Sequence, residues 1–137
     1  MWIVYALLAA FFAAVVAILA KIGIEGVNSN LAVAIRTVVV LAMAWIIVFV
    51  TGKHSEIAAI TQKSWIFLVL SGFATGFSWL FFYKALQIGD VAKVVPIDKL
   101  SIVITMLLAF AILGEPVSVK TIIGAILITI GTLVLVL

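Results

Sequence analysis

Five apolar stretches, each long enough to cross a lipid bilayer, dominate this chain of 137 residues. A membrane-spanning helix needs about 20 apolar residues to cross about 30 Å of hydrocarbon. We predict helices because a lone strand in lipid leaves its backbone unpaired, and because these runs do not alternate as barrel strands do. The sequence therefore predicts an all-α membrane protein whose five spans cover residues 2–20, 31–50, 65–83, 94–113 and 119–137.

The composition excludes a water-soluble fold. The chain is 68% hydrophobic, its mean hydropathy is +1.52, and it has only 8 basic and 5 acidic residues. The length allows one domain, residues 1–137. No basic segment precedes the first stretch and four more spans follow it, so we expect a retained helix rather than a cleaved signal.

The sequence contains no pattern of an enzyme or a metal site. It has no cysteine, which excludes disulfides, thiolate metal sites and thiol catalysis. His54 is a single loop histidine, and no nucleophile–base pair, carboxylate dyad or phosphate-binding glycine loop is present. We expect no catalytic activity, no cofactor, no bound metal and no nucleic-acid partner.

The connections between spans carry helix-capping signals. Ser29 or Asn30 is expected to cap the second span, and Ser118 the fifth. Gly114, followed by a proline two residues later, predicts a left-handed helix end and hence an antiparallel hairpin of the last two spans. Residues 51–64 are either a short helix on the membrane surface or a loop.

The fourth span differs from the other four. Its apolar run, Leu100–Leu113, is only roughly 21 Å long at 1.5 Å per residue, so the span must include Pro96, Asp98 and Lys99. Proline leaves a backbone carbonyl without its donor, and charges inside a span are candidate functional groups. The segment is similar to the discontinuous helices of transport sites. Alternatively, Pro96 is an ordinary first-turn proline and Lys99 snorkels to the interface.

The two charges of the fourth span are expected to have partners elsewhere in the chain. Asp98 and Lys99 are adjacent, so they point about 100° apart around a helix, and Asp98 has no basic residue four positions away. The candidate partners are Lys21, Arg36 and Lys84 for Asp98, and Glu25 for Lys99.

Two further groups of side chains remain open between a structural and a functional role. Arg36 lies inside the second span and is either a snorkelling anchor or a ligand for substrate. Trp79 and Tyr83, four residues apart, form either an interfacial aromatic belt or a stacking surface. The candidate residues for substrate binding or gating are therefore Pro96, Asp98, Lys99, Lys84, Arg36, Trp79 and Tyr83.

Small residues mark two candidate packing faces. Gly72 and Gly76 lie four apart in the third span, and Gly124 and Gly131 lie one heptad apart in the fifth, with Ala125 beside them. Small residues let helix backbones approach closely in lipid. These faces are predicted to pack either within one chain or between two copies.

An odd number of spans places the two termini on opposite faces of the membrane. Basic residues at the ends of the spans are then divided three against three between Lys53, Lys63, Lys120 and Lys21, Lys84, Lys93. When Arg36 and Lys99, which lie inside spans near the second side, are counted too, the division is three against five. The positive-inside rule selects no firm orientation from so small an excess. We hypothesise that the chain inserts both ways and pairs with an inverted copy; the alternative is one orientation with the N-terminus outside.

Two segments carry a family resemblance. They are KALQIGDVAKVVPIDKLS, from Lys84 to Ser101, and LGEP followed by IGAILITIG, from Leu113 to Gly131. With the first span, they make essentially the whole chain similar to a single EamA domain of the drug/metabolite transporter superfamily.

The resemblance implies a small-molecule transporter that works by alternating access in a prokaryotic inner membrane. Similar proteins usually carry two such domains related by inversion, around a cavity lined mainly by helices one, three and four. A single domain implies an inverted homodimer. The glutamate that small multidrug exporters carry on their first helix has no counterpart between Trp2 and Ala20, and Asp98 is the only acidic residue near a span that could replace it. Other possibilities are a subunit of a lipid-linked sugar flippase or of another heteromeric transporter, and a non-transporting scaffold; no residue specifies the substrate.

Overall fold

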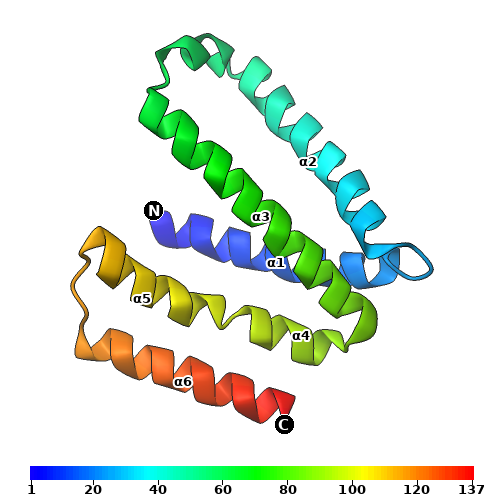
Figure 1. Ribbon diagram of the computed structural model, residues 1–137, viewed down its shortest axis with the longest axis vertical. Coiled ribbons are helices and arrows are strands. Elements are labelled where there is room, and N and C mark those ends of the chain that lie inside the picture. The colour runs from blue at the N-terminus through cyan, green and yellow to red at the C-terminus, as the bar shows by residue number, and fades with distance from the viewer. The chain divides into compact units, whose positions relative to one another are not determined.

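The computed structural model describes residues 1–137, which form helices joined by short turns (Figure 1). In chain order these are α1 (Trp2–Gly23), α2 (Ser29–Val50), the 3₁₀ helix η1 (Lys53–Ala59), α3 (Gln62–Ile88), α4 (Val91–Asp98), α5 (Ser101–Leu113) and α6 (Val119–Val136). Helices α4 and α5 together make one candidate span, Val91–Leu113, so that 5 segments are long and apolar enough to cross a membrane. The all-α fold with five spans is confirmed.

The chain divides into two compact units. The central unit, Leu19–Gln87, contains the end of α1, then α2, η1 and α3. The terminal unit, Met1–Ile18 with Ile88–Leu137, contains most of α1 together with α4, α5 and α6.

Most large apolar side chains point away from the rest of the chain. Phe81 and Val134, for example, are 74% and 73% exposed. Lipid is as apolar as these side chains, so burying them inside one chain brings little gain. In the central unit the buried residues gather where α1 ends, α2 begins and α3 ends; they are Ala20, Ile24, Ser29, Val33, Tyr83 and Leu86.

Helix α2 begins earlier than the sequence predicted. The side chain of Asn28 accepts hydrogen bonds from the backbone N–H groups of Asn30 and Leu31, at 2.9 and 3.3 Å. An asparagine in extended conformation is among the best N-caps, and Asn28 has that conformation. The cap is therefore Asn28 rather than Ser29 or Asn30, because Ser29 is already helical and buried.

The connection between α2 and α3 is helical. Gly52 adopts the left-handed conformation, with φ 70°, directly before η1. Within η1, the Lys53 ammonium pairs with the Glu56 carboxylate at 2.6 Å, and both side chains are exposed. Of the two alternatives for residues 51–64, the structure has the short helix; its position at a membrane surface stays a prediction.

The last two helices of the terminal unit form the predicted antiparallel hairpin (Figure 1). Gly114 ends α5 in the left-handed conformation, with φ 66°, which favours glycine because a side chain would be strained there. Ser118 caps α6 by accepting a hydrogen bond from the backbone N–H of Thr121 at 3.1 Å. Helix α6 packs against both α4 and α5.

The fourth span is broken between α4 and α5. At the break, the backbone N–H of Leu100 donates to the carbonyl of Ile97 at 3.0 Å. In an uninterrupted α-helix it would donate to the carbonyl of Pro96, four residues back. That carbonyl instead accepts a hydrogen bond from the hydroxyl of Thr132 on α6, at 3.3 Å, and Thr132 is only 6% exposed. A side chain of α6 thus replaces the donor that the break removes.

Replacing Thr132 with valine is expected to destabilise the protein by about 0.5–1 kcal/mol, since the Pro96 carbonyl loses its donor while the shape is nearly kept. Thermal unfolding of the detergent-purified protein measures this loss. Thr129→Val is the matched control, because the Thr129 hydroxyl donates at 2.8 Å to the Ala125 carbonyl of its own helix. Equal stability of the two variants would show that the Thr132 hydrogen bond contributes nothing.

Candidate functional site

Three of the predicted site residues meet inside the central unit. The guanidinium carbon of Arg36 on α2 lies 4.0 Å from the centroid of the Trp79 ring and 5.6 Å from that of Tyr83, both on α3. These three residues are called the Arg36 cluster. The arrangement differs from a set of independent interfacial anchors, since the two aromatic rings face one cation.

Local sequence explains why these side chains meet. On α2, Ser29, Val33 and Arg36 are spaced four and three apart, so they share one helix face, and the first two are buried. On α3, Trp79 and Tyr83 share a face in the same way, and Tyr83 is buried. The buried faces of α2 and α3 therefore bring the cation onto the rings.

The Arg36 guanidinium is only partly satisfied. A cation over an aromatic ring is stabilised by about 0.5–1 kcal/mol when exposed and by about 2 kcal/mol when desolvated. However, one terminal nitrogen of Arg36 is buried and has no hydrogen-bond partner. Guanidinium presents five N–H donors in a plane that matches carboxylate and phosphate. The structure therefore leaves one donor of the cluster without an acceptor.

Two hydrogen bonds fasten the neighbouring end of α3. The Lys21 ammonium donates to the Leu86 carbonyl at 2.5 Å, and the Gln87 side-chain amide donates to the Val27 carbonyl at 2.7 Å. Both cross from the end of α1, or from the turn after it, to the last turn of α3. The first satisfies a carbonyl in the last turn of α3, which the helix end leaves without a donor, and the second satisfies a carbonyl of the turn between α1 and α2.

A small pocket lies beside these bonds. Its volume is about 400 Å³, and it is lined by Lys21, Ile22, Ile24, Glu25, Gly26 and Gln87. The lining has one basic side chain, Lys21 at the end of α1, and one acidic side chain, Glu25 in the turn after it, so this pocket carries no excess charge of either sign.

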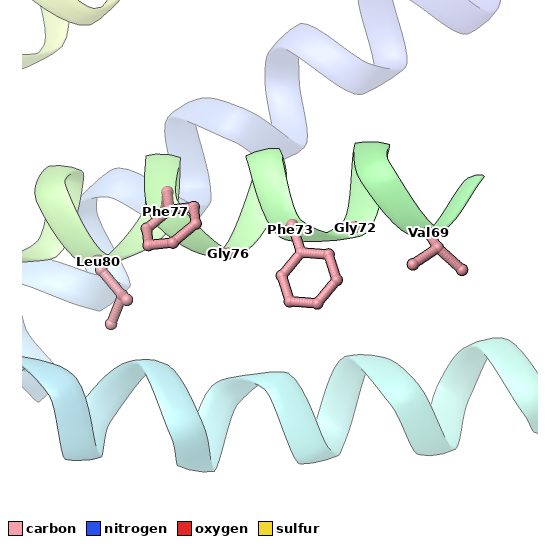
Figure 2. A pocket seen from close by; sticks show the side chains of 6 residues that line it. All are labelled: Val69, Gly72, Phe73, Gly76, Phe77 and Leu80. Carbon is pink, nitrogen blue, oxygen red and sulfur yellow. The ribbon is translucent and has the colours of Figure 1, made fainter. Parts of the chain in front are cut away.

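An apolar groove runs along α3 in the same unit. It has a volume of about 380 Å³ and is lined by Val69, Gly72, Phe73, Gly76, Phe77 and Leu80. Figure 2 shows the side chains of Val69, Phe73 and Leu80 on the side of α3 that faces α2. We call it the α3 groove. The two glycines make its floor, because neither carries a side chain.

The remaining predicted residues of the fourth span lie in the terminal unit, at the helix break. Pro96 is inside α4, beyond its first turn, so the alternative of a first-turn proline does not hold. The Lys99 ammonium lies 3.3 Å from the Asp98 carboxylate, and the two side chains are 49% and 36% exposed. The prediction that both charges find partners in other segments is therefore wrong, because Asp98 and Lys99 pair with each other. On a regular helix the side chains of Asp98 and Lys99 would point apart. The chain turns at the helix break, and the two side chains can therefore meet.

The other predicted residues are Lys84 and the small residues of α3 and α6; neither Lys84 nor the glycines make a close contact that the sequence predicted. Lys84 is exposed on α3. A Cβ atom added at Gly72, Gly76, Gly124 or Gly131 would meet nothing within 4 Å, so no other part of the chain packs closely on these positions. Ala125 and Gly124 are half-buried on α6, whereas Gly131 is exposed. The role of these small residues in packing between copies stays a prediction.

Sequence reasoning missed two polar contacts that shape these regions. Thr132 lies on the half-buried face of α6 with Ala125 and Thr129. A polar residue on that face could have indicated a hydrogen bond to another helix, which the structure has between Thr132 and the Pro96 carbonyl. Gln87 gave no comparable signal, because its partner is a backbone carbonyl 60 residues away.

Comparisons with known proteins agree with this architecture. The family model of the EamA-like transporter family matches residues 1–137. A protein of Sinorhizobium sp. named "Uncharacterized transporter in cobO 3′region" is 44% identical over 134 residues, which cover 98% of this chain and 95% of that protein. No solved structure matches the chain. With its five candidate spans and a family match over its whole length, the chain is an integral membrane protein that belongs to the EamA-like transporter family.

Proposed function

We propose that this membrane transporter exchanges a small molecule by alternating access, as a homodimer of two oppositely inserted copies. The observation that carries the proposal is the broken fourth span, with an ion pair at the break. Irregular backbone within a membrane is tolerated where it is buried in protein or lines a cavity. Transporters build their sites from such interrupted helices.

The break supplies both a hinge and charges. At the Lys99–Leu100 turn, α4 and α5 are joined by tight backbone bonds instead of a continuous helix, so the two segments can change their relative angle at little cost. Asp98 and Lys99 are held by a single ion pair at 3.3 Å between partly exposed side chains. Such a pair is weak and can exchange one partner for a substrate or an ion. We assign Pro96 the helix break, Asp98 the partner of substrate or ion, and Lys99 its counter-charge.

Two observations support the dimer. The matched segment covers 95% of the Sinorhizobium relative, so that protein has no room for a second domain of this size. Within the chain, most large apolar side chains and the glycines of α6 remain uncovered. Such faces permit close helix packing with another copy.

The balance of basic residues supports opposite insertion. Three lysines at each side of the membrane give the insertion machinery little basis for choosing an orientation. A mixed population in one membrane then provides both halves of an inverted pair. We propose the inner membrane of a prokaryotic cell as the location, in keeping with the source of the relative.

Asp98→Asn and Lys99→Gln are each expected to lower transport at least about tenfold, a loss of roughly 1.4 kcal/mol of interaction, while the dimer still assembles. The substrate is first identified by thermal-shift screening of the detergent-purified protein against metabolite and drug libraries. Its uptake into proteoliposomes is then compared between wild type and both variants. Chemical cross-linking measures the dimer.

Glu56→Gln is the control, since it removes an exposed lysine–carboxylate pair elsewhere, that of Glu56 with Lys53 on η1, and leaves the number of basic residues unchanged. If Asp98→Asn and Lys99→Gln both transport as well as wild type, the ion pair only anchors the helix end. A purified chain that assembles only with a second polypeptide would indicate a flippase subunit instead, and one that no compound stabilises would indicate a scaffold.

A further inference from the structure

We propose that the Arg36 cluster and the α3 groove together bind an amphiphilic anion, with its acidic group on Arg36 and its apolar body in the groove. The inference rests on the proposed transport function, since it names the class of substrate that this part of the protein would carry. All residues involved belong to the central unit.

The cation supplies the first argument. Arg36 lies on the second turn of α2, about 10 Å along the helix from Ser29 at 1.5 Å per residue, where an unpaired charge is costly. The two ion pairs of the structure are Lys53 with Glu56 and Lys99 with Asp98. One Arg36 nitrogen is buried without a hydrogen-bond partner. An acidic ligand would supply the missing acceptor.

The geometry of α3 supplies the second argument. Gly72, Gly76 and Leu80 follow one another at a spacing of four, and Tyr83 comes three residues later. Residues at these spacings lie on one helix face, so the groove continues directly into the aromatic side of the cluster. When the apolar body of the amphiphilic anion lies in the groove, its acidic group is therefore next to Arg36.

The size and lining of the groove fit a small organic body. Its volume of about 380 Å³ is at the lower end of the range of roughly 300–1,000 Å³ for small-molecule sites. Two of its six lining residues are phenylalanines and none is polar. Two glycines keep it open, and a Cβ at either would meet no atom within 4 Å.

The charge of the surrounding residues favours an anion over a cation. Besides Arg36, this end of the unit carries Lys21 and Lys84, against the single carboxylate of Glu25 in the α1–α2 turn. A positively charged amphiphile would meet an unpaired guanidinium at the head of the groove. Like charges in such contact are repelled by several kcal/mol in a low-dielectric site, so selectivity for the anion follows.

The test measures binding to the full chain in nanodiscs of neutral phosphatidylcholine. The probes are 4-phenylbutyrate and the matched cation 4-phenylbutylammonium. We expect the carboxylate to bind at least about tenfold more tightly than the amine. Arg36→Gln should weaken carboxylate binding about tenfold, equal to about 1.4 kcal/mol, and Arg36→Lys by less, because the charge remains. Glu56→Gln, which leaves the number of basic residues unchanged, should bind like wild type.

The groove is tested separately by filling it. Gly76→Leu should weaken 4-phenylbutyrate binding about tenfold, whereas Ala74→Leu, which introduces the same side chain at an exposed position of α3 outside the groove, should leave it unchanged. Nanodiscs containing phosphatidylglycerol distinguish the source of the ligand. If they weaken probe binding in wild type but not in Arg36→Gln, the natural anion is a lipid; if they do not, it is a soluble metabolite.

Equal affinity for both probes, or unchanged carboxylate binding by Arg36→Gln with native helicity, would overturn the proposal. So would a Gly76→Leu variant that loses the dimer but keeps its carboxylate affinity, since the groove would then hold a helix of the second copy. Anion binding by a chain that forms no inverted dimer would refute the proposed assembly alone. An inverted, transporting dimer without anion selectivity would refute this inference alone.

Discussion

The rest of the structure depends on the need to pair polar groups in a solvent that offers them no hydrogen bonds. In the central unit, Lys21 and Gln87 donate to backbone carbonyls across helix ends. In the terminal unit, Thr132 donates to the carbonyl that the helix break leaves open. Because apolar contacts bring little net gain in lipid, these few polar contacts carry much of the specificity of helix packing. We propose that a ligand binds where such pairing is incomplete.

Incomplete pairing occurs in two places, with different consequences. Arg36 is stabilised by the rings of Trp79 and Tyr83, but one of its nitrogens has no hydrogen-bond partner. This arrangement suits a negatively charged ligand. Asp98 and Lys99 satisfy one another, though only at 3.3 Å and partly exposed, which suits a pair that opens. We propose that the first arrangement binds substrate and that the second moves during transport.

Local signals were sufficient to predict the helices but not their contacts. Gly114 and Ser118 act within their own turns, so the hairpin of α5 and α6 followed from sequence. For the fourth span the sequence left two alternatives, a helix broken at Pro96 and an ordinary first-turn proline, and the structure has a break, which lies at Lys99–Leu100. The sequence predicts the N-cap of α2 one or two residues too late, because Asn28, Ser29 and Asn30 are all good capping residues. Ser29 is buried in the structure, and its burial depends on packing that the local sequence does not reveal. The meeting of Arg36 with Trp79 depends on how two distant helices pack, and spacing within one helix does not determine that.

The central claim, an inverted dimer, is tested most directly by cross-linking between single cysteines, since the chain has none of its own. Ser55 and Leu137 lie on opposite sides of the membrane in one copy of a five-span chain, and hence on the same side in two inverted copies. Ser55→Cys and Leu137→Cys chains with different tags are coexpressed and treated with a bismaleimide that does not cross membranes. The account predicts mixed Ser55–Leu137 cross-links and no Leu137–Leu137 cross-links. Leu137–Leu137 cross-links without mixed ones would show a parallel dimer and contradict it.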